Sequence, residues 1–140
     1  MPHRFLPDVA LADIAFEATS DSLSGLFEAC ALALTDIMVD PSTLRAAKSK
    51  EVTLNAEDRE RLLYDFLTEL IVVKDVDSLL FKEVKVTLTK DGGALKASLR
   101  GEPIDRVRHT LRNDVKAVTM HMFSIVNTPE GWKATVVLDI

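Results

Sequence analysis

The C-terminal run of the chain, "GWKATVVLDI" (131–140), is the feature that most constrains the fold. Apolar and β-branched residues continue to the last position, whereas chain ends more often carry small polar residues that fray. One alternating set of the run is entirely apolar and would share one face of an extended segment: Ala134, Val136, Leu138 and Ile140. We predict a strand inside a sheet, which would hold the α-carboxylate of Ile140 beside the side chain of Asp139.

Size and composition predict one globular domain that spans residues 1–140. The chain is 47% hydrophobic, within the globular range, and its 140 residues match the usual length of a single domain. It has no apolar run of the roughly 20 residues that a membrane helix needs, and its N-terminal residues lack a secretory signal. The lone Cys30 lies in "LFEACALAL" and is typical of a core thiol in a reducing compartment. We therefore expect a cytoplasmic protein that does not enter the membrane.

Apolar periodicity predicts two amphipathic helices among a series of strands. The first helix follows Ser22 as its N-cap and ends before Asp40-Pro41, and the second follows Asp58. The end of the second, "LIVVKDVD" (70–77), fits either a helix or a strand. Strands are expected at residues 11–18, 50–56, 81–90, 94–101, 115–126 and 132–140. This order predicts an α+β fold: a single small domain in which two amphipathic helices pack on an antiparallel or mixed β-sheet.

Charge and motif content argue against nucleic-acid binding and against catalysis. The net charge is −5, and the most basic stretch, "GEPIDRVRHTLRNDVK" (101–116), is interleaved with acids and is interpreted as a solvated loop. A protein partner or a cation is therefore expected as the ligand. The sequence has no glycine-rich phosphate loop and no paired-Cys or His-x-x-x-His metal spacing. His121 is interpreted as a hydrogen-bonded core residue, and His109 as a solvated one. We expect a protein that is not an enzyme.

Two acidic residues stand out by their position. Asp13 is the only charged residue between Asp8 and Glu17, and Asp139 interrupts the apolar end of the chain. Taken alone, either could cap a neighbouring turn or mark a sheet edge.

The order of several segments is similar to that of the archease family over essentially the whole chain. The matching stretches are "ADI" (12–14), "SLSGLFEACALALTDIM" (22–38), "LLYDFLTELI" (62–71), "GEPID" (101–105), "VKAVTMH" (115–121) and the terminal "GWKATVVLDI". The resemblance implies a small α+β domain of the archease or SHS2-like type, built on a strand–helix–strand unit. It also implies a protein cofactor of an RtcB-type RNA ligase, which promotes guanylylation and turnover of the ligase in tRNA splicing or RNA repair.

The same resemblance implies a divalent-cation site. Its ligands correspond to Asp13, to Asp139 and to Ile140 through its terminal carboxylate. Calcium is favoured because it accepts six to eight oxygen ligands in flexible geometry, with magnesium or manganese as substitutes.

The first-strand motif departs from the family pattern. Where the family reads Asp-His-Thr-Ala-Asp-Ile, this chain reads "PDVALADI", so Ala10 and Leu11 occupy the His and Thr positions. Met120 stands where an aromatic residue usually precedes His121. An alternative hypothesis is therefore a protein-interaction or chaperone-like module of the same fold that does not activate a ligase. The sequence leaves open the oligomeric state and the surface that would contact the ligase.

Overall fold

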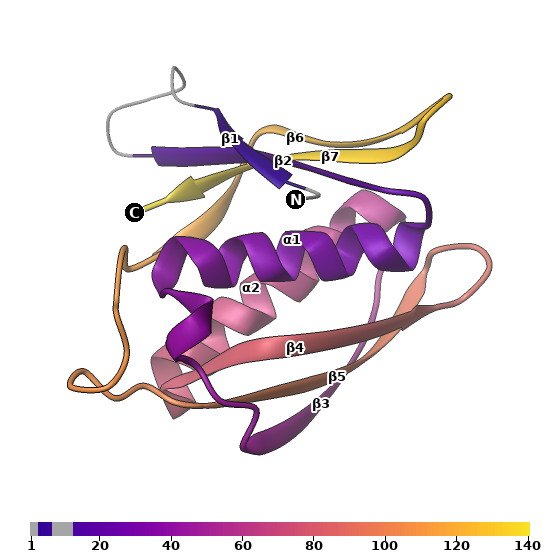
Figure 1. The fold of residues 1–140 in the computed structure, drawn as a ribbon. Helices are drawn as coiled ribbons and strands as arrows, with labels where there is room; N and C mark the ends of the chain where they lie inside the picture. Colours follow the sequence, from indigo (N-terminus) through magenta and orange to yellow (C-terminus); the bar gives the residue numbers. More distant parts are fainter. Residues whose placement is uncertain (1–2, 7–12) are drawn as a thin grey trace.

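The computed structural model describes residues 3–6 and 13–140, and these form three layers, with two helices between two sheets (Figure 1). One sheet has four strands in the order β1 (His3–Leu6), β2 (Asp13–Ser20), β7 (Gly131–Asp139) and β6 (Ala117–Thr128). The other has three strands in the order β3 (Lys48–Asn55), β5 (Ala94–Pro103) and β4 (Leu79–Leu88). All strand pairs in both sheets are antiparallel. The helices are α1 (Leu23–Met38) and α2 (Arg59–Asp77), and a short 3-10 turn, η1 (Pro41–Thr43), follows α1.

Both helices begin at the caps that the sequence predicts. The Ser22 hydroxyl accepts a hydrogen bond from the Gly25 N–H (3.0 Å), and the Asp58 carboxylate accepts one from the Arg61 N–H (2.8 Å). Helix α1 ends at Met38, just before Asp40 and Pro41, as expected. Helix α2 continues through the ambiguous residues 70–77 and ends at Asp77, where Ser78 caps it in a left-handed conformation.

The hydrophobic core lies between the two sheets, around the helices. The rings of Phe27 from α1 and Phe66 from α2 stack with centroids 6.3 Å apart, and both side chains are fully buried. Cys30 is buried in the same core, as predicted, and burial raises the pKa of its thiol well above the ordinary value.

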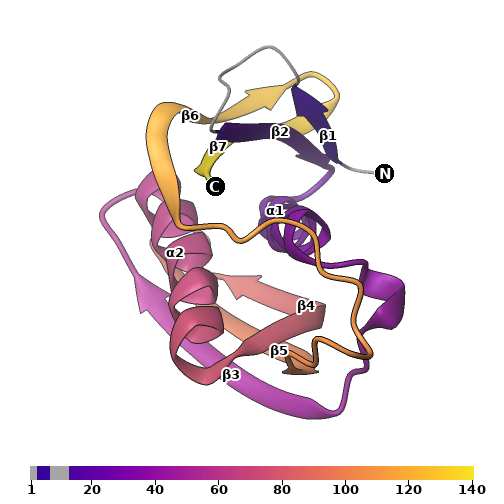
Figure 2. The same ribbon diagram turned by 90° about the vertical axis from the view of Figure 1, so that its left-hand side faces the viewer.

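The fold class predicted from the sequence is confirmed, and the structure adds the division into two sheets. Helix α1 contacts β2 of one sheet and β4 of the other, and α2 likewise contacts β6 and β4 (Figure 2). Each helix therefore buries two faces instead of one. The short edge strand β1 was not predicted from the sequence.

Residues 104–116 carry the chain from the three-stranded sheet to the four-stranded one, and we call the second part of this connection, residues 109–116, the strap (Figure 2). Its first half is bonded to the C-terminal end of α1: the Asp40 N–H donates to the Thr110 carbonyl (2.8 Å), the Arg112 N–H to the Met38 carbonyl (2.8 Å) and the Asn113 N–H to the Ile37 carbonyl (3.1 Å). The Arg112 and Asn113 bonds satisfy two carbonyls that the end of a helix leaves without intrahelical partners, and the Asp40 bond ties the strap to the residue before η1.

The second half of the strap is bonded to α2 and to β7. The buried Lys74 ammonium donates to the Asp114 carboxylate and to the Val115 carbonyl (2.9 Å). The Lys116 N–H then donates to the Asp139 carbonyl (2.8 Å), immediately before β6 begins. The strap therefore fixes the entry of β6 beside the end of β7.

Gly101 in β5 is predicted to be intolerant of any side chain. A Cβ at this position would lie 1.8 Å from the Leu80 carbonyl oxygen, next to the bulge of β4 between Phe81 and Glu83. We expect Gly101→Ala to lower the free energy of unfolding by more than about 2 kcal/mol, measured by urea denaturation. Gly93→Ala is the matched control, because its nearest contacts are 3.3 Å or more away and we expect a change below about 1 kcal/mol. Equal midpoints for the two variants would contradict this prediction.

Candidate metal site

Asp13 and Asp139 are direct partners in the antiparallel pairing of β2 with β7. Directly opposite residues project from the same face of a sheet, with Cβ atoms about 5 Å apart. Both side chains are partly exposed, and Ile140 follows Asp139 with its side chain packed against the core. The structure thus places all three sequence-predicted site residues at one corner of the four-stranded sheet, which we call the acidic corner (Asp13, Asp139 and Ile140).

The strands on either side hold Asp139 in place. It pairs with Asp13 of β2 on one side and with Ala117 of β6 on the other, and its carbonyl accepts the strap's Lys116 N–H. The backbone at Asp139 is therefore bonded from both neighbours, which limits how far the two carboxylates can move apart.

The donor set of the acidic corner fits a hard cation that also takes backbone oxygens and water. Within residues 3–6 and 13–140, no three His, Cys, Asp or Glu side chains gather closely enough to hold a metal ion by themselves. Asp13 and Asp139 supply two carboxylates, and the α-carboxylate of Ile140 is a backbone group outside that count. Such an open oxygen site suits calcium better than a closed tetrahedral zinc site. The departures at Ala10 and Leu11 lie outside the described residues.

A cavity of about 380 Å³ borders the acidic corner on the side of α1. Its lining includes Asp13 from β2, Asp36 from α1 and Arg112 from the strap. Arg112 Nη1 donates to the Asp36 carboxylate (2.6 Å) and to the Asp36 backbone carbonyl (2.7 Å). His3 Nε2 lies 3.4 Å from the other Asp36 carboxylate oxygen, so the cation of Arg112 is firmly anchored next to the site.

The interpretation of His121 as a core residue is wrong, because its side chain is exposed. The register between β6 and β7 shifts between Thr119 and Ser124, and Met122 within that interval has a φ of 57°. The irregularity breaks the strict alternation on which the interpretation rested. Met120 and Met122 beside it are also exposed, at 59% and 52%.

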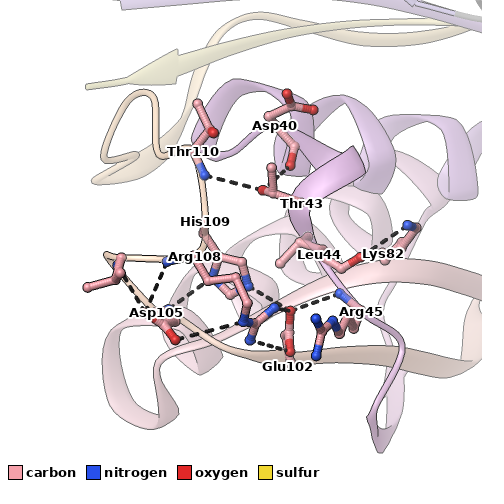
Figure 3. A network of polar contacts seen from close by, with 11 residues as sticks. Asp40, Thr43, Leu44, Arg45, Lys82, Glu102, Asp105, Arg108, His109 and Thr110 are labelled. Carbon is pink, nitrogen blue, oxygen red and sulfur yellow. Dashed lines mark hydrogen bonds and ion pairs between the residues drawn. The ribbon is translucent and has the colours of Figure 1, made fainter.

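The interpretation of His109 as solvated is also wrong. The prediction that residues 101–116 form a solvated loop is therefore wrong for part of that stretch. His109 and Glu102 are buried, with 4% and 5% of their surfaces exposed. Figure 3 shows the network that they form between the end of β5, the strap and the segment after η1. The pattern of alternating charges in residues 101–116 does not predict this burial, because the burial depends on chain segments that are distant in sequence.

Glu102 is the centre of this network. Its carboxylate accepts two hydrogen bonds from the Arg108 guanidinium (2.7 and 2.8 Å), one from the Arg45 N–H (2.9 Å) and one from His109 Nε2 (2.6 Å). The Asp105 N–H donates to His109 Nδ1 (2.9 Å), so Nε2 must carry the ring proton that faces Glu102. The Arg108 bonds, followed by the His109 bond, hold the pKa of the Glu102 carboxyl far below its ordinary value.

A comparison with protein families identifies the family to which this chain is related. The sequence model of the archease protein family (MTH1598/TM1083) matches residues 4–140. This chain belongs to the archease family.

Individual relatives agree with this assignment. Protein archease of Pyrococcus abyssi is 42% identical over 132 residues, which cover 92% of this chain and 93% of that protein. Protein archease of Methanothermobacter thermautotrophicus is 40% identical over 131 residues, with the same coverage.

Two solved structures share the archease fold seen here. The solution structure of Methanobacterium thermoautotrophicum protein 1598 superposes with a TM-score of 0.81 at 36% identity, over 99% of both chains. The crystal structure of an archease and possible chaperone from Thermotoga maritima superposes with a TM-score of 0.64 at 20% identity, over 96% of both chains. At that identity, the second likeness supports the fold alone. Neither described helix of this archease is long and apolar enough to cross a membrane.

The Glu102 network predicts acid sensitivity. A carboxyl with a lowered folded-state pKa stabilises the fold above its unfolded-state pKa, near 4.5, and this stabilisation is lost as the pH falls below that value. We expect Glu102→Gln to lower the urea midpoint at pH 7 and to flatten its fall between about pH 5 and pH 3.

Glu51→Gln provides a matched control, since Glu51 is exposed on β3 and bonds to Ser98 on the outer face of the sheet. Its acid profile should follow that of the wild type. A Glu102→Gln profile parallel to the wild type would show that the network contributes nothing to the pH dependence.

Proposed function

We propose that this archease is a divalent-cation-binding protein cofactor that activates an RtcB-type RNA ligase in tRNA splicing or RNA repair. It would promote guanylylation of the ligase and its turnover, and it would perform no catalysis of its own. The observation that carries the proposal is the direct pairing of Asp13 with Asp139, one residue from Ile140, in a chain of the archease family.

The residues of the acidic corner are matched to a cation by their charge. Two like charges about 5 Å apart, the usual spacing of directly opposite Cβ atoms, repel by about 3 kcal/mol at an effective dielectric constant near 20. Solvent reduces this repulsion for Asp13 and Asp139, because both side chains are partly exposed. A bound divalent cation would supply a positive centre that relieves this repulsion. Asp13, Asp139 and the Ile140 α-carboxylate would hold it, and the backbone bonds of β2, β6 and the strap would orient those ligands.

Calcium is the proposed ion, with magnesium or manganese as substitutes. The two side chains leave most of the coordination shell to backbone carbonyls and water, and calcium tolerates such irregular oxygen shells. Magnesium requires a tighter octahedron and retains its water more strongly.

The acidic corner would also provide the surface that docks near the ligase active site. The chain carries a net charge of −5, which disfavours direct binding to RNA and leaves the ligase as the partner in contact with nucleic acid. In this arrangement the cofactor would act on the metal-dependent step of the ligase, and it would not touch the RNA.

The alternative function is a chaperone-like interaction module. The exposed Met120 and Met122 on β6 favour it, because methionine surfaces adapt to varied partners. The Thermotoga maritima relative is itself described as a possible chaperone. A module of this kind would bind partners without any need for a cation.

A guanylylation assay tests the ligase hypothesis. We expect the wild-type chain to accelerate labelling of the ligase by GTP, and Asp13→Ala to reduce that acceleration by roughly tenfold or more, because a metal ligand is lost. Asp77→Ala, at the exposed end of α2, is the control and should act as the wild type does. Equal stimulation by Asp13→Ala and the wild type would reject a role for the acidic corner.

A pair of tagged proteins tests the role of Ile140. Residues added after Ile140 convert its carboxylate into a neutral amide, whereas residues added before Met1 leave it charged. At calcium about 100-fold above Kd, the wild type and the N-terminally extended chain should be stabilised by about 2.7 kcal/mol and melt several degrees higher. The C-terminally extended chain should lose most of this shift. Identical shifts would remove Ile140 from the site, and no shift in any protein would favour the module.

A further inference from the structure

The Arg112–Asp36 ion pair lies beside the acidic corner without belonging to it. Asp36 and Arg112 line the same cavity as Asp13, and Arg112 is the cationic side chain among the described residues of that lining. The guanidinium donates to the Asp36 carboxylate at 2.6 Å and to the Asp36 carbonyl at 2.7 Å.

Chain geometry limits the distance between this pair and the site. The strap residue Lys116 bonds to the Asp139 carbonyl, only four residues after Arg112. Four residues span at most about 14 Å even when fully extended, and the Arg112 N–H is itself bonded to Met38. The pair therefore lies within the range at which charges interact at low ionic strength, where the Debye length is about 30 Å at 0.01 M salt.

We propose that the Arg112–Asp36 ion pair keeps the charge beside the acidic corner balanced, and that loss of either partner alone shifts the affinity of the corner for divalent cations. This inference rests on the cation site of the proposed function. While the two side chains are paired, their charges cancel, and a bound cation interacts only with the electric field of the carboxylates of the acidic corner. Removing Arg112 leaves the Asp36 charge uncompensated and attracts the cation, whereas removing the Asp36 charge leaves Arg112 uncompensated and repels it.

The proposal predicts opposite effects from the two halves of one ion pair. If the pair were only structural, breaking it from either side would destabilise the fold in the same direction and would leave the affinity of intact protein unchanged. Opposite shifts in calcium affinity are therefore a signature of an electrostatic role.

Calorimetric titration of the full chain with calcium chloride tests the proposal. In about 0.01 M salt, we expect Arg112→Gln to lower Kd by about threefold to tenfold and Asp36→Asn to raise it by a similar factor. In about 1 M salt, where the Debye length is near 3 Å, both effects should shrink to less than about twofold. Arg112→Lys keeps the charge without the planar fork and should bind calcium as the wild type does.

Matched controls separate local charge from net charge. Arg100 of β5 and Glu83 of β4 are exposed partners that pair with each other at 3.6 Å. Their three-stranded sheet lies on the opposite side of the helices from the sheet that carries the acidic corner (Figure 1). Arg100→Gln and Glu83→Gln change the net charge as the two test variants do and should leave Kd within about twofold of the wild type. Urea denaturation checks that each variant is folded. If Arg112→Gln does not fold, Arg112→Lys is compared with the wild type instead. A raised or lowered Kd for Arg112→Lys would then overturn the role of charge.

The outcomes distinguish this inference from the proposed function. A wild-type chain that binds no calcium overturns the cation site and the inference with it. The inference alone is overturned if the wild-type chain binds calcium but Arg112→Gln has the same calcium affinity as Arg100→Gln, or binds calcium more weakly than the wild type does.

Discussion

The antiparallel pairing of β2 with β7 is the constraint on which the candidate site depends. Its register sets Asp13 opposite Asp139, and a slip of one residue would place Ile14 there and turn the carboxylate to the other face. The buried side of the same pairing makes such a slip costly, because Phe16 and Val136 are fully buried partners that face the helices. The hydrophobic core therefore holds two like charges together, at a place where they would otherwise separate.

The strap connects this corner to the rest of the molecule. It begins at the buried His109–Glu102 contact, passes the end of α1 at Arg112 and reaches β7 through the Lys116 N–H. A segment without regular secondary structure normally moves more than its surroundings, but this one is bonded along its length to α1, α2 and β7. It thereby links the buried Glu102 network at the end of β5 to the partly exposed acidic corner of the four-stranded sheet, and Arg112 lines the cavity beside that corner.

Local signals in the sequence predicted much of this architecture, because caps and periodicity act within a few residues. Ser22 and Asp58 begin their helices as expected, and the predicted strands at 81–90, 94–101, 115–126 and 132–140 all form. The errors at His109 and His121 have a common cause. Burial of His109 depends on Arg108, Glu102 and the distant Arg45, and exposure of His121 depends on an irregularity in β6 that alternation cannot foresee. The cation at the acidic corner stays a prediction.

The sequence by itself determined the α+β class, the starts of both helices and the end of α1, membership of the archease family and the identity of the acidic residues, since these follow from local pattern and from similarity along the chain. Only the tertiary structure decided which strands are neighbours. It placed Asp13 against Asp139 and Arg112 against Asp36, and it buried Glu102 under donors from two distant parts of the chain. Such contacts join residues far apart in sequence, and their formation depends on the packing of two sheets around the same pair of helices.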